Sequence, residues 1–357
     1  MRCRTSSLLT LCFLALACGD DDRRVVGDED TGPREMGMAT SDQAVRIDQN
    51  VSVDMAAVDG PNPIVDPRCL DGQYTETLPN VSAPIDDVPF ESIGQYTDAV
   101  LDRRYPVGAA IVRGGRTSPS FPGDCDEEFA SVFGPVTSGA DVIRSMGFIV
   151  HECGHVYDRA LSTVGEDVYF LTSDLTLSCQ RGDTTSRGGD TFARSRIRRD
   201  SFSALRPPGE GAGMDSYGDI YLDGDPDDAD FDSGDQGFNL LFEEFVQYTN
   251  SLAEAWAFRD QLPQFQSTSG RDGILTFAWY LQRYLRMART EFPDAYARIT
   301  NDCWRPAILS AWGRAWLFID ATEGMDNIGI NDAAIYELAT DPELLGEIQR
   351  LRELDGC

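Results

Sequence analysis

The two histidines of this chain lie in one short stretch, H-E-C-G-H, at residues 151–155. The flanking run from Val142 to Leu161 is apolar at helical spacing, which predicts a buried helix. Imidazoles four residues apart on a helix point to the same side, so His151 and His155 can bind one Zn²⁺ at about 2.0–2.1 Å. Glu152 can flank the metal and accept a proton from its bound water. The alternative is a chance match with both histidines bonded in the core, and the lack of histidine elsewhere favours the zinc site.

The beginning of the chain predicts export. Residues 1–4 include two arginines, Leu8 to Ala17 form a short apolar run, and Cys18 follows it. This order is typical of a secretory signal, and the apolar run is too short to span a membrane. Residues 15–18 (A-L-A-C) are similar to a bacterial lipobox. We therefore expect a lipoprotein signal peptide over residues 1–18, with a lipid anchor on Cys18; an ordinary cleaved signal peptide is the alternative.

Two further regions differ in composition. Residues 19–67 are acidic, with little periodicity and few aromatic residues, so they cannot bury enough apolar surface to offset the entropy of ordering. We expect a disordered acidic linker there. Residues 68–357 contain frequent aromatic residues and long amphipathic stretches, and they are long enough for a large core. This part is predicted to fold as one domain or as two closely packed lobes.

The charge balance excludes one class of partner. The formal net charge is −30, and all 30 basic residues are arginines. Nucleic-acid binding requires basic surface, so no nucleic-acid partner is expected.

The cysteines fit an oxidising compartment. Cys3 and Cys12 leave with the signal, and an even number remains beyond Cys18, which favours up to three disulfides. Cys153 lies inside the histidine motif and points roughly away from the metal, so a buried free thiol is its alternative. The six cysteines are Cys69, Cys125, Cys153, Cys179, Cys303 and Cys357.

Periodicity predicts a predominantly helical α+β fold. One short strand is expected at Val107–Val112, between Pro106 and a glycine pair, and Asp141 is the expected N-cap of the motif helix. The expected helices are Phe90–Arg104, Asp124–Phe133, Val142–Leu161, Phe238–Phe258, Ile274–Thr290, Arg305–Ile319 and Asn331–Leu354, the last broken near Asp341-Pro342.

Residues 173–235 are expected to be irregular, and residues 219–235 are strongly acidic. A Ca²⁺ site is one interpretation, because Asp223, Asp225 and Asp227 match the first ligands of an EF-hand loop. Asp228 stands where that loop needs glycine, which favours a solvated acidic loop.

The motif H-E-C-G-H, followed three residues later by Asp158, resembles the zincin metallopeptidases, most closely the branch with the lethal-factor-like peptidases. Gluzincins take a third ligand from a glutamate on a later helix, often within E-x-[FW]-[AV]-[EQ], and residues 243–247 (E-E-F-V-Q) fit that pattern. The resemblance covers two short segments. It implies Zn²⁺ held by His151, His155 and Glu243, with Glu152 as general base. It also implies an upper lobe with a small sheet and the motif helix, and a helical C-terminal lobe.

The residues themselves leave the third ligand open. On the helix expected over 238–258, Glu244 lies closer to the apolar stripe than Glu243, so amphipathicity alone favours Glu244. The resemblance favours Glu243, because Phe245 follows it by two positions. Glu254, followed by Trp256, is a second alternative.

The transition state of peptide hydrolysis needs a further donor for its oxyanion. Tyr217, Tyr221 and Tyr248 are the candidates, without a ranking. Asp158 could orient a ligand imidazole, and an ordinary solvated or capping Asp is its alternative.

We therefore expect a zinc-dependent metallopeptidase that hydrolyses a peptide or protein substrate and is anchored at the bacterial cell envelope through Cys18. The alternative from another class is a non-catalytic envelope lipoprotein whose zinc site is structural or degenerate and whose role is binding. A structural zinc site usually has four protein ligands, whereas a catalytic site keeps one position open. An envelope protein without metal is the third possibility.

Overall fold

The computed structural model describes residues 64–357, apart from residues 120, 182–191, 207–215, 223–235 and 263–269. The expected signal peptide, the lipid anchor and the linker up to residue 63 lie outside the described residues. The aspartates of the calcium interpretation, 223–228, also lie outside them. Asn62–Cys357 form one compact unit. In the described part of the chain, no helix combines the length and apolarity needed to cross a membrane.

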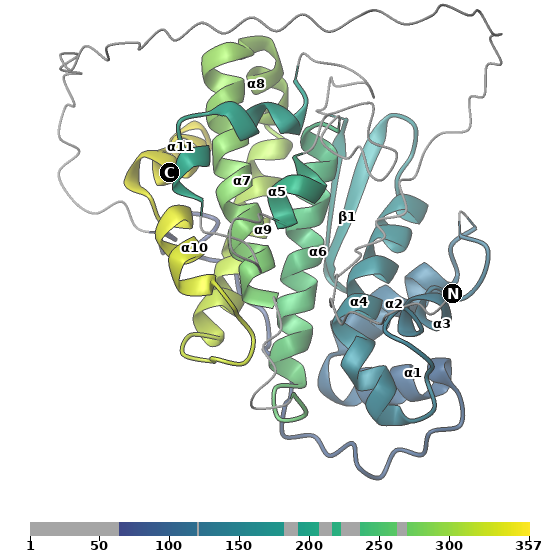
Figure 1. The fold of residues 1–357 in the computed structure, drawn as a ribbon. Helices are drawn as coiled ribbons and strands as arrows, with labels where there is room; N and C mark the ends of the chain where they lie inside the picture. The colour runs from purple at the N-terminus through teal and green to yellow at the C-terminus, as the bar shows by residue number, and fades with distance from the viewer. Residues whose placement is uncertain (1–63, 120, 182–191, 207–215, 223–235, 263–269) are drawn as a thin grey trace, which may run out of the picture. The chain divides into compact units, whose positions relative to one another are not determined.

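This unit is predominantly helical, with a small two-stranded antiparallel sheet (Figure 1). The strands are β1 (Glu166–Thr172) and β2 (Leu175–Gln180), and the 3₁₀ helices are η1 (Arg194–Arg199) and η2 (Ser203–Leu205). The α-helices are α1 (Ile93–Arg104), α2 (Pro106–Arg116), α3 (Cys125–Ala130), α4 (Gly139–Leu161), α5 (Ser216–Tyr221), α6 (Phe238–Ala257), α7 (Gly270–Glu291), α8 (Pro293–Ile299), α9 (Trp304–Ala321), α10 (Asp332–Ala339) and α11 (Pro342–Leu354).

The motif helix α4 begins three residues before the expected start. Its N-cap is Ser138, whose Oγ accepts the backbone N–H of Asp141, so the prediction of Asp141 as N-cap was wrong. The Asp141 carboxylate instead accepts hydrogen bonds from the Ser138 hydroxyl and the Thr137 backbone N–H. Ser138 thus satisfies one backbone N–H that the first turn leaves free, as N-cap residues do.

The predicted strand at Val107–Val112 is also wrong, because these residues lie in α2. Pro106 occupies the first turn, where its fixed φ suits a helix. The buried residues of α2 follow helical spacing, and the helix packs against α1 and α4. At Gly115 a Cβ would lie 2.6 Å from the Cys153 carbonyl oxygen, so glycine permits the close approach to α4.

The hairpin β1–β2 lies in and just before the stretch that we expected to be irregular. Tyr169 pairs with Leu177 across the two strands, and β1 packs on α4 and α6. β1 is almost continuously buried, whereas β2 alternates between buried and exposed residues.

α6 is the central element of the unit. It packs against α4 and β1 as well as α7 and α9 (Figure 1). Its tryptophan-rich neighbour α9 contributes the largest fully buried side chains, Trp304, Trp312 and Trp316. α6 therefore connects the motif helix with the C-terminal helices.

Three disulfides join distant parts of this unit, in agreement with the expectation of up to three. Cys125–Cys153 links α3 to the motif helix, so Cys153 is not a free thiol. The other two pairs are Cys179–Cys303, which links β2 to the N-cap of α9, and Cys69–Cys357.

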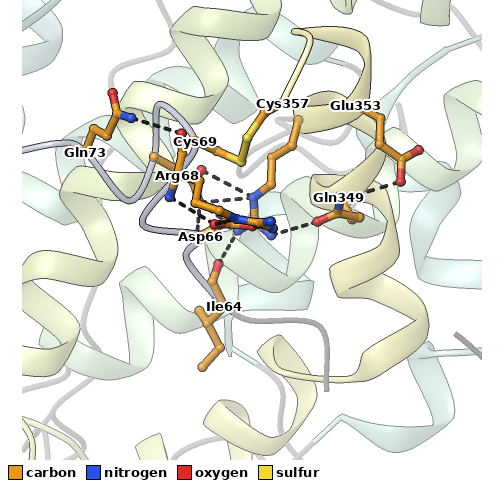
Figure 2. The surroundings of a disulfide bond; sticks show 10 residues. Ile64, Asp66, Arg68, Cys69, Gln73, Gln349, Glu353 and Cys357 are labelled. Atoms are coloured by element: carbon orange, nitrogen blue, oxygen red, sulfur yellow. Dashed lines mark hydrogen bonds and ion pairs between the residues drawn. A yellow bond between two sulfur atoms is a disulfide. The ribbon is translucent and has the colours of Figure 1, made fainter. Parts of the chain in front are cut away.

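The first described residues pack on the last helix (Figure 2). Arg352 of α11 is almost fully buried, and its Nη2 donates to the Asp71 carboxylate (2.6 Å) and to the Ile64 carbonyl oxygen (2.8 Å). The Cys69–Cys357 disulfide closes the same junction. Ile64 therefore belongs to the folded unit, although we assigned residues up to 67 to the linker.

Candidate metal centre

The two expected histidines converge with a glutamate of α6. The His151 and His155 Nε2 atoms are 3.1 Å apart, and Glu244 Oε2 lies 3.4 Å from the first and 3.6 Å from the second. The ligand atoms of these three residues lie within 4.8 Å of one another. Two imidazoles and one carboxylate form a ligand set that suits Zn²⁺.

The other ring nitrogen of each histidine has a partner. The Ser251 hydroxyl donates to the Gln247 carbonyl oxygen (3.2 Å), so at 3.1 Å it accepts from His151 Nδ1. Glu243 Oε1 lies 3.0 Å from His155 Nδ1, and an ionised carboxylate can only accept. In their neutral forms both rings therefore carry the proton on Nδ1, and both Nε2 lone pairs are available to a metal.

Glu243, the expected third ligand, thus lies on the Nδ1 side of His155, outside the group formed by the two Nε2 atoms and Glu244. Glu254 is ten residues beyond Glu244, about 15 Å along the helix axis. It is buried against Gly147 of α4, where a Cβ would lie 3.0 Å from Glu254 Oε2. The geometry favours Glu244 over both.

His151 and Glu244 are buried, and His155 is partly exposed. Burial raises the pKa of Glu244, but His155 and His151 outweigh it, and the net pKa is lowered. Burial lowers the pKa of His155, but Glu244 and Glu243 outweigh it and raise the pKa well above its usual value. Glu152 is 5 % exposed, and burial raises its pKa, partly offset by the two histidines.

The three candidate tyrosines gather beside the centre. The Tyr248 ring packs edge-on against His151, with centroids 4.7 Å apart, and its hydroxyl lies 3.0 Å from the Tyr221 hydroxyl. The Tyr217 ring centroid is 6.0 Å from that of Tyr248. Phe277 of α7 stacks on Tyr248, with ring centroids 4.9 Å apart.

Asp158 does not contact a ligand imidazole. Its Oδ1 accepts the Phe170 backbone N–H (2.8 Å), and its Oδ2 accepts from Gln247 Nε2 (2.7 Å). The carboxylate therefore joins the end of α4 to β1 and to α6.

Sequence reasoning considered Glu243 only as a ligand, and it missed Ser251 and Gln247. Glu243, Gln247 and Ser251 recur every four residues on α6, so they form one polar stripe on a helix that is mostly buried. That spacing was the available signal. Arg194 had no such signal. Its buried guanidinium lies 5.5 Å from the Tyr221 ring centroid, and its Nε and Nη1 lack a partner among the described residues.

Comparison of the chain with protein-family models, curated proteins and solved structures finds no match.

Proposed function

We propose that this chain is a zinc-dependent metallopeptidase with His151, His155 and Glu244 as metal ligands and Glu152 as general base. The observation that carries the proposal is the convergence of two Nε2 atoms and one carboxylate oxygen, while both Nδ1 atoms are held by Glu243 and Ser251. Such outer partners fix the tautomer and the ring orientation that a metal needs.

The chemistry proposed is hydrolysis of a peptide bond. A bound Zn²⁺ would polarise the scissile carbonyl and lower the pKa of its water towards about 7. Glu152 then accepts the proton of the attacking water and delivers it to the leaving amine. The Tyr248 ring packs against His151, and the paired hydroxyls of Tyr248 and Tyr221 are the donors proposed for the developing oxyanion.

The proposed setting is the bacterial cell envelope, with a peptide or protein as substrate. The three disulfides fit a compartment outside the cytoplasm. The lipid anchor on Cys18 remains part of the proposal.

One observation favours the alternative of a non-catalytic zinc site. His151 is only 3 % exposed and Glu152 only 5 %, whereas a catalytic site needs an open coordination position that a substrate can reach. In that case His151, His155 and Glu244 would hold a zinc ion without catalysis, and the protein would act in binding.

The Glu152→Gln variant distinguishes the catalytic from the non-catalytic zinc site. We expect purified wild-type protein to hold about one Zn²⁺ per chain and the variant to keep the metal. The variant should lose hydrolysis of a broad peptide library by orders of magnitude, because an amide cannot accept the proton. His155→Ala should abolish zinc binding. A wild-type protein that holds zinc but cleaves no peptide would support the structural site.

A further inference from the structure

A chain of buried polar side chains joins α6 to α4 beside the metal ligands. Gln247 Nε2 donates to Asp158 Oδ2 over 2.7 Å, and Gln247 Oε1 accepts from Asn250 Nδ2 over 2.9 Å. Gln247 and Asn250 have no exposed surface, and Asp158 is 2 % exposed. Buried polar groups that satisfy one another in this way hold one specific packing arrangement.

Arg314 determines which groups donate and which accept in this network of side-chain hydrogen bonds. Arg314 of α9 carries only donors, and its Nη1 lies 2.6 Å from Asn250 Oδ1, which must accept. Asn250 Nδ2 must then donate to Gln247 Oε1, which leaves Gln247 Nε2 to donate to Asp158. Arg314 is itself held by Glu76, at 2.7 Å, and its side chain is 1 % exposed. The orientation of the Gln247 amide is therefore determined by its surroundings.

Gly154 makes room for that amide. A Cβ on Gly154 would lie 1.9 Å from Gln247 Oε1 and 2.6 Å from its Cδ. Both distances are shorter than a Cβ atom normally keeps from a neighbouring heavy atom. Gly154 immediately precedes His155. The glycine between the two histidines thus lets the amide of α6 reach the backbone of the motif helix.

These contacts lie within one turn of the ligands on both helices. Gln247 follows Glu244 by three residues, and Asp158 follows His155 by three residues. We propose that Gln247 is a positioning residue that sets the separation and rotation of α6 against α4, and thereby brings Glu244 to the two histidine Nε2 atoms. The effect of Gln247 on zinc binding rests on the proposed function. Its effect on the packing of α6 against α4 can be tested in the metal-free protein.

The first test measures zinc affinity by competition with a chelator. Loss of a partner outside the coordination sphere typically weakens metal binding 10–100-fold, and we expect Gln247→Ala to fall in about that range. Gln282→Ala is the matched control, because Gln282 is also fully buried and bonds the Ala278 and Ala339 carbonyl oxygens within the C-terminal helices. The control should lower the thermal midpoint and leave the zinc affinity unchanged.

The second test needs no metal. The chain has two histidines, so selective ¹⁵N-histidine labelling yields NMR signals from the centre alone. In the metal-free protein Gln247→Ala should shift the ring signals of both histidines, and Gln282→Ala should shift neither.

The third test uses the clash at Gly154. Gly154→Ala should destabilise the metal-free protein, and the double variant Gly154→Ala/Gln247→Ala should be more stable than additive losses predict, because truncation of Gln247 removes the overlap.

Unshifted histidine signals in folded Gln247→Ala, or additive losses in the double variant, would overturn the positioning role. A wild-type protein that binds no zinc would refute the proposed function, while the signals and the double variant would still decide the role of Gln247.

Discussion

At the scale of single residues, neighbouring carboxylates of α6 occupy different positions. Adjacent residues on an α-helix are about 100° apart, so Glu243 and Glu244 cannot face the same atoms. Glu244 reaches the two Nε2 atoms, and Glu243 reaches Nδ1 of His155. Glu254 lies on the same helix, away from both histidines.

The ligand assignment predicts a ranking of zinc affinities. Glu244→Ala should cause the largest loss, because it removes a ligand. Glu243→Ala should weaken binding by about 10–100-fold, as expected for a partner outside the coordination sphere. Chelator competition measures both. A larger loss in Glu243→Ala than in Glu244→Ala would reassign the third ligand.

The raised pKa of Glu254 predicts that the stability of the fold depends on pH. Burial raises its pKa to about 8 from the ordinary 4.5. Between about pH 4.5 and pH 8, the folded state therefore keeps a proton on Glu254 that the unfolded state releases. As pH rises through this range, this group lowers the free energy of unfolding by up to about 1.4 kcal/mol per pH unit.

Glu254→Gln should remove that loss. We expect the variant to unfold at a higher denaturant concentration than the wild type at pH 8, and the difference to shrink towards pH 5. Equal midpoints across this pH range would contradict the raised pKa.

At the scale of elements, α4 is held on two sides. α6 contacts it through the polar stripe of Glu243, Gln247 and Ser251, and α3 is joined to it by the Cys125–Cys153 disulfide. Cys153 lies between the two histidines and is fully buried. The covalent bond therefore acts directly on the turn of α4 that carries the ligands.

Loss of this disulfide should affect the centre as well as stability. For its sequence separation of 28, loop closure predicts a loss of about 3–4 kcal/mol in the Cys125→Ser/Cys153→Ser variant. We also expect weaker zinc binding by the folded variant. The control is Cys179→Ser/Cys303→Ser, which lies between β2 and α9 and should lose stability while retaining its zinc affinity. Equal zinc affinities in the two variants would show that the Cys125–Cys153 disulfide does not support the centre.

At the scale of the whole molecule, a disulfide links the beginning of the compact unit to its end. The Cys69–Cys357 disulfide joins the first described residues to the end of the chain (Figure 2). The buried Arg352–Asp71 pair joins them to α11. Ile64, the first described residue, therefore lies at a junction that a disulfide closes.

The proposed anchor predicts how the full chain partitions. The wild-type protein should sediment with membranes and carry lipid on Cys18, whereas Cys18→Ser should be soluble or remain unprocessed. Fractionation and mass spectrometry of the N-terminus measure both. An unmodified N-terminus at or beyond Gly19 would contradict the anchor.

The long helices were predictable because their signal is local. Apolar residues at a spacing of three to four predicted α1, α4, α6, α7 and α9, and Pro342 predicted the break between α10 and α11. The apolar run at Val107–Val112 is too short for periodicity to separate strand from helix, and its burial between α1 and α4 decided for helix. The strand β1 was missed because it is almost continuously buried, so its apolar and polar residues do not alternate.

The sequence alone determined that His151 and His155 share one helical face, because a spacing of four residues has the same meaning in any α-helix. It also placed several carboxylates on α6, but the choice among them depends on how α6 is rotated against α4. Only the tertiary structure decided that Glu244 faces the Nε2 atoms, that Glu243 and Ser251 hold the Nδ1 atoms, and that Gly154 admits Gln247. These contacts join residues about 90–100 positions apart, and no local periodicity encodes the angle between two helices.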